Sequence, residues 1–256
     1  MALEPFSIPF APEMVTDLHR RLDATRWNDA VTGNWMMGTE RGFLERLVRF
    51  WRESYDWKAR VASLNALPHF RGSFDGLGVH FLHFRSGGGG LPLLLMNGWP
   101  SSFIEFQRLA PLLTSGSPGF DVVVPTMPGF GFSDRPSRPY QVELSDLYPA
   151  LMSDLGYDRF MVAGTDIGSG VATRIALRHP HRVLGLHVSS VAPKPGNPEG
   201  GPVTPAEIDY EARVALWSRE EGAYQALQST RPQTLAFGLA DSPVGLASWI
   251  IEKMRG

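Results

Sequence analysis

The stretch Phe160-Met161-Val162-Ala163-Gly164-Thr165-Asp166-Ile167-Gly168 decides the fold of this chain. It opens with an apolar run of strand length, continues with an acidic residue between two glycines, and leads into a helical pattern over 170–178. This strand–turn–helix order is the setting of a nucleophile elbow, a strained turn that lifts a nucleophilic side chain above a sheet. Only small neighbours let strand and helix approach one another at such a turn. We therefore predict that Asp166 is a nucleophile.

The same turn is open to two competing interpretations. Asp commonly caps the helix that follows it, so Asp166 is also a candidate helix cap. The glycines could instead cradle a phosphate, but no Lys-Ser or Lys-Thr pair follows them. A serine nucleophile at Ser169 is disfavoured because that residue lies past the elbow.

Further short apolar runs lie on both sides of the elbow in the sequence. We expect strands in four of them: Val79–Phe84, Leu93–Met96, Val122–Pro125 and Val183–Val188. Helical stretches separate these runs, at 103–113, 144–155 and 170–178. Strands that consist of continuous apolar runs are typical of a parallel sheet buried on both faces. The sequence therefore predicts an α/β fold with a mostly parallel sheet.

Three segments divide the chain. We expect residues 1–70 to be an N-terminal helical meander with four Trp residues, 71–192 to be the α/β core, and 193–256 to be a linker and a partial helical cap. The linker, at 193–205, is rich in proline, which interrupts regular structure. After it, helical patterns cover 208–217, 222–227 and 244–254.

Composition excludes several classes of function. The 256 residues carry 24 Lys and Arg against 26 Asp and Glu, so there is no basic footprint for nucleic acid. The absence of Cys excludes disulfides and a thiolate nucleophile. No stretch has the length of a membrane span, and the first residues lack a signal-peptide pattern, so we expect a cytoplasmic protein. No His, Asp and Glu cluster has metal-ligand spacing, and we expect no metal and no cofactor.

Two loops add to the candidate site. Asn97-Gly98-Trp99-Pro100 directly follows the apolar run at 93–96. In α/β-hydrolases the loop at this place lends a backbone N–H to the oxyanion hole, so we expect the N–H groups of Trp99 and Ile167 to form that hole, with Gly98 and Pro100 beside them. The alternative is a turn that only buries the indole. The second loop, 125–134, follows the next strand at the edge where α/β sheets bind ligands, but it could also be a rigid surface turn.

Together these segments resemble the microsomal-type branch of the epoxide hydrolase family, which has the α/β-hydrolase fold. The specific elements are the Gly-x-Asp-x-Gly elbow and the Gly-Trp-Pro loop. Further matching segments extend over nearly the whole chain: Pro5–Phe10, Asp56-Trp57, Leu64-Asn65, His80-Phe81 with His83, Glu221–Gln225, Gln228–Thr234 and Asp241–Leu246.

The resemblance implies a mechanism. Asp166 would attack a carbon of a small apolar epoxide and form an alkyl ester. Tyr224, which matches the cap tyrosine of the family, would protonate the leaving alkoxide, although its position alone suits an ordinary surface or core tyrosine. Water would then hydrolyse the ester to a vicinal diol while the N–H groups of Trp99 and Ile167 hold the oxyanion. Such enzymes would serve detoxification or the catabolism of aromatic hydrocarbons.

The sequence departs from the family at several positions. The family places an acid and a catalytic His after the cap, whereas the seven histidines here all precede the cap-like region: His19, His69, His80, His83, His179, His181 and His187. We therefore expect this chain to lack its C-terminal strands and to turn over poorly. Asn97 stands where the family has His. Phe237 stands where relatives often have Tyr, and we expect it to be a packing residue.

The missing strands have a consequence for association. A sheet without its far strands has an exposed apolar edge, so we expect poor solubility or pairing with another copy through the open sheet.

Two further functions stay open. Haloalkane dehalogenases share the Asp nucleophile but bind halide with a Trp beside it, and Ile167 at that place disfavours them. A non-catalytic or vestigial hydrolase-like binding protein is favoured by the missing catalytic base.

Overall fold

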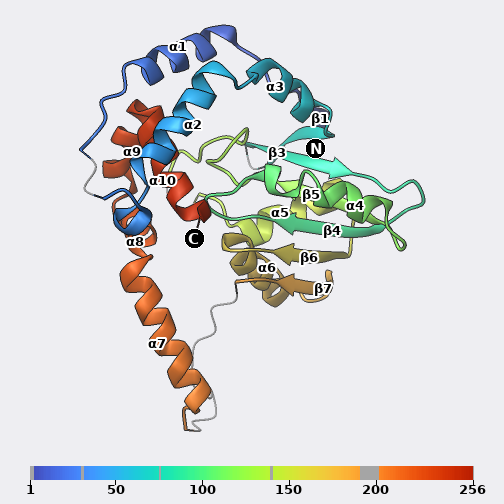
Figure 1. Cartoon of the computed structure of the whole chain (residues 1–256). Helices are drawn as coiled ribbons and strands as arrows, with labels where there is room; N and C mark the ends of the chain where they lie inside the picture. The colour runs from blue at the N-terminus through green and yellow to red at the C-terminus, as the bar shows by residue number, and fades with distance from the viewer. Residues whose placement is uncertain (1–2, 30–31, 75, 139–140, 191–201, 256) are drawn as a thin grey trace. The chain divides into compact units, whose positions relative to one another are not determined.

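The chain forms two compact units (Figure 1). A computed structural model describes residues 3–29, 32–74, 76–138, 141–190 and 202–255. One unit combines Met1–Phe10 with Trp57–Val191, and the other combines Ala11–Asp56 with Ala192–Gly256. Most of the linker expected at 193–205 lies outside the described residues.

The first unit contains a sheet with the strand order β1-β2-β3-β5-β4-β6-β7. Its strands are β1 Leu3–Pro5, β2 His69–Phe74, β3 Leu77–Phe84, β4 Leu91–Met96, β5 Phe120–Pro125, β6 Phe160–Gly164 and β7 Val183–Val188. Strands β5, β4, β6 and β7 pair in parallel, while β1, β2, β3 and β5 pair antiparallel. β2, β4, β5, β6 and β7 therefore run in one direction, and β1 and β3 run in the other.

Helices cover both faces of this sheet, as the apolar runs predict. On one face, α5 Leu144–Asp154 and α6 Ile167–Arg178 pack over a cluster that includes Leu94, Met96 and Val123. On the other face, α3 Trp57–Asn65, η2 Phe103–Phe106 and α4 Leu109–Ser115 cover Leu93, Leu95, Val122 and Val124. Neighbouring residues of β4 and β5 thus point into two different cores, which is why both strands are apolar throughout.

The four strands expected outside the elbow are confirmed, and so is the strand at the elbow itself. The continuous helix expected at 103–113 is wrong: the chain forms η2, turns at Gln107, and then begins α4. Pro111 explains the break, because it has no N–H for the carbonyl of Gln107 and its ring would clash there in a continuous helix.

The second unit is helical. It contains α1 Pro12–Asp23, η1 Trp35–Met37, α2 Arg41–Glu53, α7 Pro205–Glu220, α8 Ala223–Thr230, α9 Pro232–Asp241 and α10 Pro243–Arg255. Its core joins segments from the two ends of the chain: Leu22 of α1, Leu44 and Val48 of α2, and Val244 of α10 are all buried in one cluster. Thr39 also donates from its hydroxyl to the carbonyl of Ser248 at 2.8 Å.

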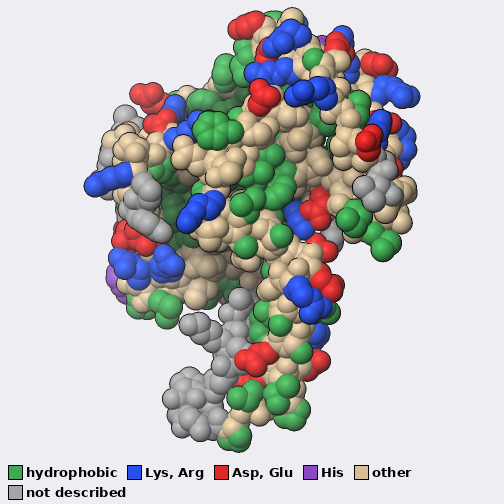
Figure 2. Space-filling view, turned by 90° about the vertical axis from the view of Figure 1, so that its left-hand side faces the viewer, with side chains coloured by type: hydrophobic (Ala, Val, Ile, Leu, Met, Phe, Trp, Pro, Cys, Tyr) green, Lys and Arg blue, Asp and Glu red, His purple; other side chains and the backbone are tan. Residues whose placement is uncertain are grey.

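Helix α7 is longer than the expected 208–217 because a capping box begins it. The Thr204 hydroxyl accepts from the N–H of Glu207, the Glu207 carboxylate accepts from the N–H of Thr204, and Pro205 occupies the first turn. Figure 2 shows hydrophobic and charged side chains mixed along this helix, and Ile208, Leu216 and Trp217 are among its exposed apolar residues.

Strand β7 lies at one edge of the sheet, with Leu184 and Leu186 exposed. Association through this edge stays a prediction. None of the described helices is by itself long and apolar enough to cross a membrane, and the pair α9 and α10, which meets those criteria only together, is bent by 119°.

A buried polar network secures the start of β5 to β3. Tyr157 donates from its hydroxyl to Asp121 at 2.8 Å, and the same hydroxyl lies 3.0 Å from Nε2 of His83. Because the hydroxyl proton goes to the carboxylate, Nε2 of His83 carries the proton that the hydroxyl oxygen accepts. Burial, aided by the charge of Arg85, lowers the pKa of His83 to about 4 despite the opposing effect of Asp121.

We expect this network to make the fold acid-sensitive. His83 has a pKa of about 4 in the folded chain against an ordinary value of 6.5, so the unfolded chain binds more protons between these values. The free energy of unfolding should therefore fall as the pH is lowered from about 6.5 to about 4, as measured by urea denaturation. His83→Gln should reduce this fall, and an equal fall in both proteins would contradict the assignment.

Candidate active site

Asp166 occupies the turn between β6 and α6, and its backbone is strained. Its φ of 52° and ψ of −121° lie outside the regions that residues with a Cβ normally adopt. Asp166 stands at the N-cap position of α6, yet its side chain makes no capping hydrogen bond. The structure thus argues against the helix-cap interpretation and leaves the carboxylate at the end of the helix, where the helix dipole favours negative charge.

The two glycines of the elbow are required by close contact. A Cβ at Gly164 would lie 2.1 Å from the carbonyl oxygen of Gly168. A Cβ at Gly168 would lie 2.4 Å from the carbonyl oxygen of Met96 at the end of β4. The steric role predicted for these glycines is therefore confirmed: they bring β6, α6 and β4 together at the turn.

The loop after β4 reaches the Asp166 carboxylate directly. The N–H of Trp99 donates to Oδ1 of Asp166 at 2.9 Å. A Cβ at Gly98 would lie 2.0 Å from the same oxygen, so no larger residue fits there without displacing the carboxylate. Pro100 follows Trp99 through a cis peptide bond. The sequence motifs grouped these loop residues with Asp166, and the structure brings them together.

Asn97 supports the loop that carries Gly98 and Trp99. It is buried, and its side-chain Nδ2 donates to the carbonyl of Gly98 at 3.0 Å. Asn97, which stands where the family has His, therefore still provides a side-chain hydrogen bond that holds the loop.

Ile167 begins α6 and is 42% exposed beside the carboxylate. Its N–H belongs to the first turn of the helix, whose N–H groups have no partner within the helix. Ser169, two residues further along the helix, is buried, and its hydroxyl donates hydrogen bonds to the carbonyls of Gly164 and Ser189. Ser169 therefore ties β6 to the segment after β7 and is not presented as a nucleophile.

The loop after β5 begins beside the loop after β4, because β5 and β4 are parallel neighbours in the sheet. Gly129 and Gly131 have φ values of 90° and 48°, which a residue with a Cβ rarely adopts. Between them, Phe130 is 48% exposed. The segment singled out in the sequence thus forms a tight turn that presents an aromatic side chain.

Tyr224 belongs to the second unit, on α8, and is half-buried. Its ring meets that of Trp217 edge to face at 6.4 Å, and Lys253 Nζ lies 5.3 Å from its centroid. Lys253 bonds to Glu221 and Glu252. Burial alone would lower the pKa of Lys253, but these bonds raise it, so a cation stays over the phenol ring.

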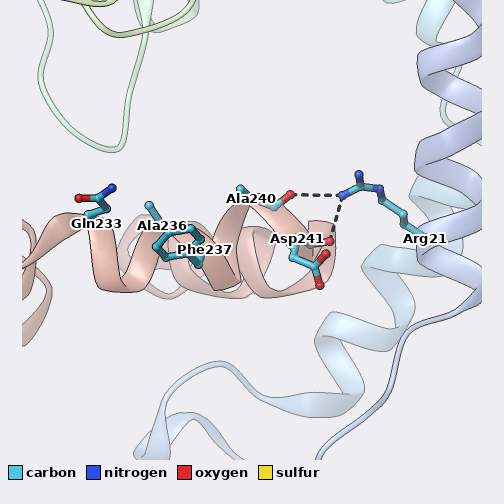
Figure 3. Close-up of a pocket in the computed structure, with 6 residues that line it drawn as sticks. All are labelled: Arg21, Gln233, Ala236, Phe237, Ala240 and Asp241. Atoms are coloured by element: carbon cyan, nitrogen blue, oxygen red, sulfur yellow. Dashed lines mark hydrogen bonds between the residues drawn. The ribbon is translucent and has the colours of Figure 1, made fainter. Parts of the chain in front are cut away.

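The second unit also contains a pocket of about 450 Å³, lined by Arg21, Gln233, Ala236, Phe237, Ala240 and Asp241. Figure 3 shows Arg21 of α1 reaching the end of α9, where it donates to the carbonyls of Ala240 and Asp241 at 3.2 and 3.0 Å. Phe237 is 73% exposed on this pocket, so its predicted packing role is wrong. α9 turns this residue away from the cluster that buries Leu22 and Val244.

No group of three or more His, Asp or Glu side chains suited to a metal ion occurs in the part of the chain that the structure describes. The sequence placed His80 in a segment that resembles the family but did not indicate its buried contact with His69, nor its contact with the loop after β5. A His on each of two adjacent strands was the available signal, but their register could not be read from the sequence.

Two family models match the chain. The model described as "Epoxide hydrolase N terminus" matches residues 3–106, and the model described as "alpha/beta hydrolase fold" matches residues 92–249. The two ranges together cover nearly all of the chain.

Individual proteins agree with these matches. A protein of Stigmatella aurantiaca (strain DW4/3-1) that is named as an epoxide hydrolase is 40% identical over 99% of this chain and 60% of its own length. Epoxide hydrolase 1 of Oryctolagus cuniculus is 33% identical over 98% of this chain and 62% of its own. The solved structure of Aspergillus niger epoxide hydrolase has a TM-score of 0.88 and 28% identity over 99% of this chain and 69% of that one. The chain thus spans about 60% of the length of the curated relatives it matches.

Substitution at Gly98 should separate the loop from the carboxylate. Because a Cβ would lie 2.0 Å from Oδ1 of Asp166, we expect Gly98→Ala to lose about 1–3 kcal/mol of unfolding free energy through overpacking. Gly170→Ala is the matched control, since a Cβ there meets nothing within 4 Å and a helical Ala is favoured over Gly by roughly 0.5–1 kcal/mol. Chemical denaturation measures both, and equal stability of the two variants would contradict the close approach.

Proposed function

Because the chain belongs to the epoxide hydrolase family of the alpha/beta-hydrolase fold, we propose that it reacts with small apolar epoxides through Asp166. The contact between the Trp99 N–H and one carboxylate oxygen supports this most directly. It fixes the carboxylate at the elbow and distinguishes its two oxygens. The exposed apolar side chain of Ile167 next to it favours an apolar substrate.

The first step is a nucleophilic substitution at carbon. Oδ2 of Asp166 attacks an epoxide carbon, a C–O ester bond forms, and the ring C–O bond breaks. Oδ1, which accepts the Trp99 N–H at 2.9 Å, becomes the ester carbonyl oxygen. Relief of ring strain drives this step, so a carboxylate that is a weak nucleophile in water is sufficient.

The second step returns the carboxylate. Water adds to the ester carbon and releases a proton, which replaces the one given to the ring oxygen in the first step. Negative charge develops on Oδ1, which already accepts a hydrogen bond from the Trp99 N–H. We propose that the N–H of Ile167, in the first turn of α6, is the second donor. The tetrahedral intermediate then expels the diol. Because the acyl carbon belongs to Asp166, hydrolysis restores the enzyme.

We assign Tyr224 as the acid that protonates the alkoxide. A phenol has an ordinary pKa near 10, far below that of an alcohol, so proton transfer to an alkoxide is downhill. The resemblance of the segment around Tyr224 to the family's cap supports the assignment.

We expect this chain to hydrolyse the ester slowly. Among the described histidines, His69, His80 and His83 are buried in hydrogen-bonded networks, and His179 is paired with Asp146. These engagements make them unsuited to activating water. We propose that the ester accumulates instead of turning over.

Intact-mass measurement tests the first step. After incubation with styrene oxide, we expect the mass of the chain to increase by one epoxide, with the modification mapped to Asp166. Asp166→Asn keeps the shape of the side chain but lacks the nucleophilic carboxylate, so it should show no adduct at this position. An unmodified wild-type chain, or an adduct that survives Asp166→Asn, would refute the proposal.

The Tyr224 assignment has its own test. Tyr224→Phe removes the proton donor, and we expect the rate of adduct formation to drop by about 10²-fold or more, a typical loss for a general acid. Tyr210→Phe, which makes the same change on α7, is the control and should react at the wild-type rate. Equal rates for Tyr224→Phe and wild type would exclude Tyr224 as the acid.

A further inference from the structure

We propose that His69, His80 and Thr126 form a buried relay that holds the loop 126–134 in place beside Asp166 and so positions the epoxide for attack. The three act as positioning residues, since none of them contacts the carboxylate. This inference rests on the proposed function.

The relay is a continuous row of three hydrogen bonds. Nε2 of His69 lies 2.8 Å from the carbonyl of Leu64, Nδ1 of His69 lies 2.8 Å from Nε2 of His80, and Nδ1 of His80 lies 2.8 Å from Oγ1 of Thr126. A carbonyl only accepts, so Nε2 of His69 carries a proton and Nδ1 accepts. The same logic places a proton on Nε2 of His80, which leaves Nδ1 to accept from the Thr126 hydroxyl. The Leu64 carbonyl at one end of the row thus fixes which atom donates in each of the three hydrogen bonds.

Burial keeps both rings neutral. His69 is 3% exposed and His80 is fully buried. Burial lowers the pKa of His80 to about 3, with smaller effects from His69 and Arg71, and it also lowers the pKa of His69 against the opposing bond to Leu64. At neutral pH the relay therefore has a single protonation pattern.

Hydrogen bonds to the backbone of His80 also join the loop to β3. The N–H of Thr126 donates to the carbonyl of His80 at 2.8 Å, and the N–H of His80 donates to the hydroxyl of Ser133 at 3.0 Å. That hydroxyl donates in turn to the carbonyl of Thr126 at 2.8 Å. His80 thus holds both ends of the tight turn that contains Gly129 and Gly131.

A second clamp lies at the end of the loop. Asp134 accepts from the N–H of Gly78 at 2.7 Å and from Arg71, while its own N–H donates to the carbonyl of Gly78 at 2.8 Å. With both ends fixed, the freedom of the loop is confined to the segment that carries the exposed Phe130.

An aromatic contact connects the relay to the loop that touches Asp166. The ring of His80 packs against Phe103 and Phe132 with centroid distances of 5.2 and 5.4 Å. Phe132 belongs to the loop after β5, and Phe103 begins η2, directly after the Trp99 loop. Because β5, β4 and β6 are adjacent in the sheet, the three loops at their carboxyl ends border one edge. His80 therefore sets the spacing between two of the loops beside the nucleophile.

Thr126→Val is the informative substitution. Valine has the shape of threonine and keeps the methyl group that lies near Gly131, but it leaves Nδ1 of His80 buried without a donor. Thr126→Ser restores the hydroxyl. Thr114→Val makes the same chemical change on α4, where the hydroxyl donates to the carbonyl of Ala110. Each variant is compared with wild type in the rate of alkylation by styrene oxide as its concentration is varied.

A positioning role predicts a specific kinetic change. In Thr126→Val we expect the epoxide concentration for half-maximal alkylation to rise by about tenfold, the factor that corresponds to one buried hydrogen bond. The maximal rate should stay near wild type, and Thr126→Ser and Thr114→Val should match wild type in both constants. A purely structural role would only lower the fraction of chain that reacts. Unchanged half-saturation in Thr126→Val would overturn the inference while leaving the function of Asp166 intact.

The relay can also be tested in the unmodified wild-type chain. Proton–nitrogen correlation spectra at neutral pH should show His69 and His80 neutral and protonated at Nε2, and a charged ring or a proton on Nδ1 would overturn the relay. If wild type forms no adduct at Asp166, the proposed function and this inference both fail. An adduct in wild type with equal kinetics in all variants refutes the relay alone.

Discussion

Between Gly98 and the Asp166 carboxylate there is no room for a single additional carbon atom, since a Cβ at Gly98 would lie 2.0 Å from Oδ1. The same crowding recurs where Gly168 meets the end of β4 and where Gly164 meets α6. In this crowded turn the backbone of Asp166 has a positive φ, and its carboxylate accepts a hydrogen bond from the Trp99 N–H. The cost in backbone strain is confined to one residue, which the surrounding sheet and helix fix in position.

This constraint is local in sequence, and for that reason it could be predicted. The glycines stand two residues on either side of Asp166, directly after an apolar strand, so spacing alone encodes the turn. The Gly-Trp-Pro loop is likewise a short motif at the end of a buried strand. What the sequence left open was whether Asp166 caps its helix, and only the dihedral angles and the Trp99 contact decide that question.

Non-local contacts were beyond sequence reasoning. Strand β1, Leu3–Pro5, is short, and it pairs with β2, which lies far along the chain at His69–Phe74. The packing of Leu22 and Val48 against Val244 joins helices from opposite ends of the sequence. Periodicity identifies the apolar face of each helix but not its partner. The contact of His69 with His80 depends on strand register in the same way, so a motif search passes over it.

His80 and Asp166 differ in how completely their polar atoms are hydrogen-bonded. Both ring nitrogens of His80 are bonded, the ring is fully buried, and its pKa is lowered to about 3, so it neither gains a proton at neutral pH nor offers a free lone pair. Asp166 is exposed, at a helix N-terminus, with one oxygen on the Trp99 N–H. The sheet unit thus contains an inert group within β3 and a reactive one directly after β6. The inert group is suited to holding loops at a fixed spacing, because its protonation does not change while the neighbouring carboxylate passes from anion to ester.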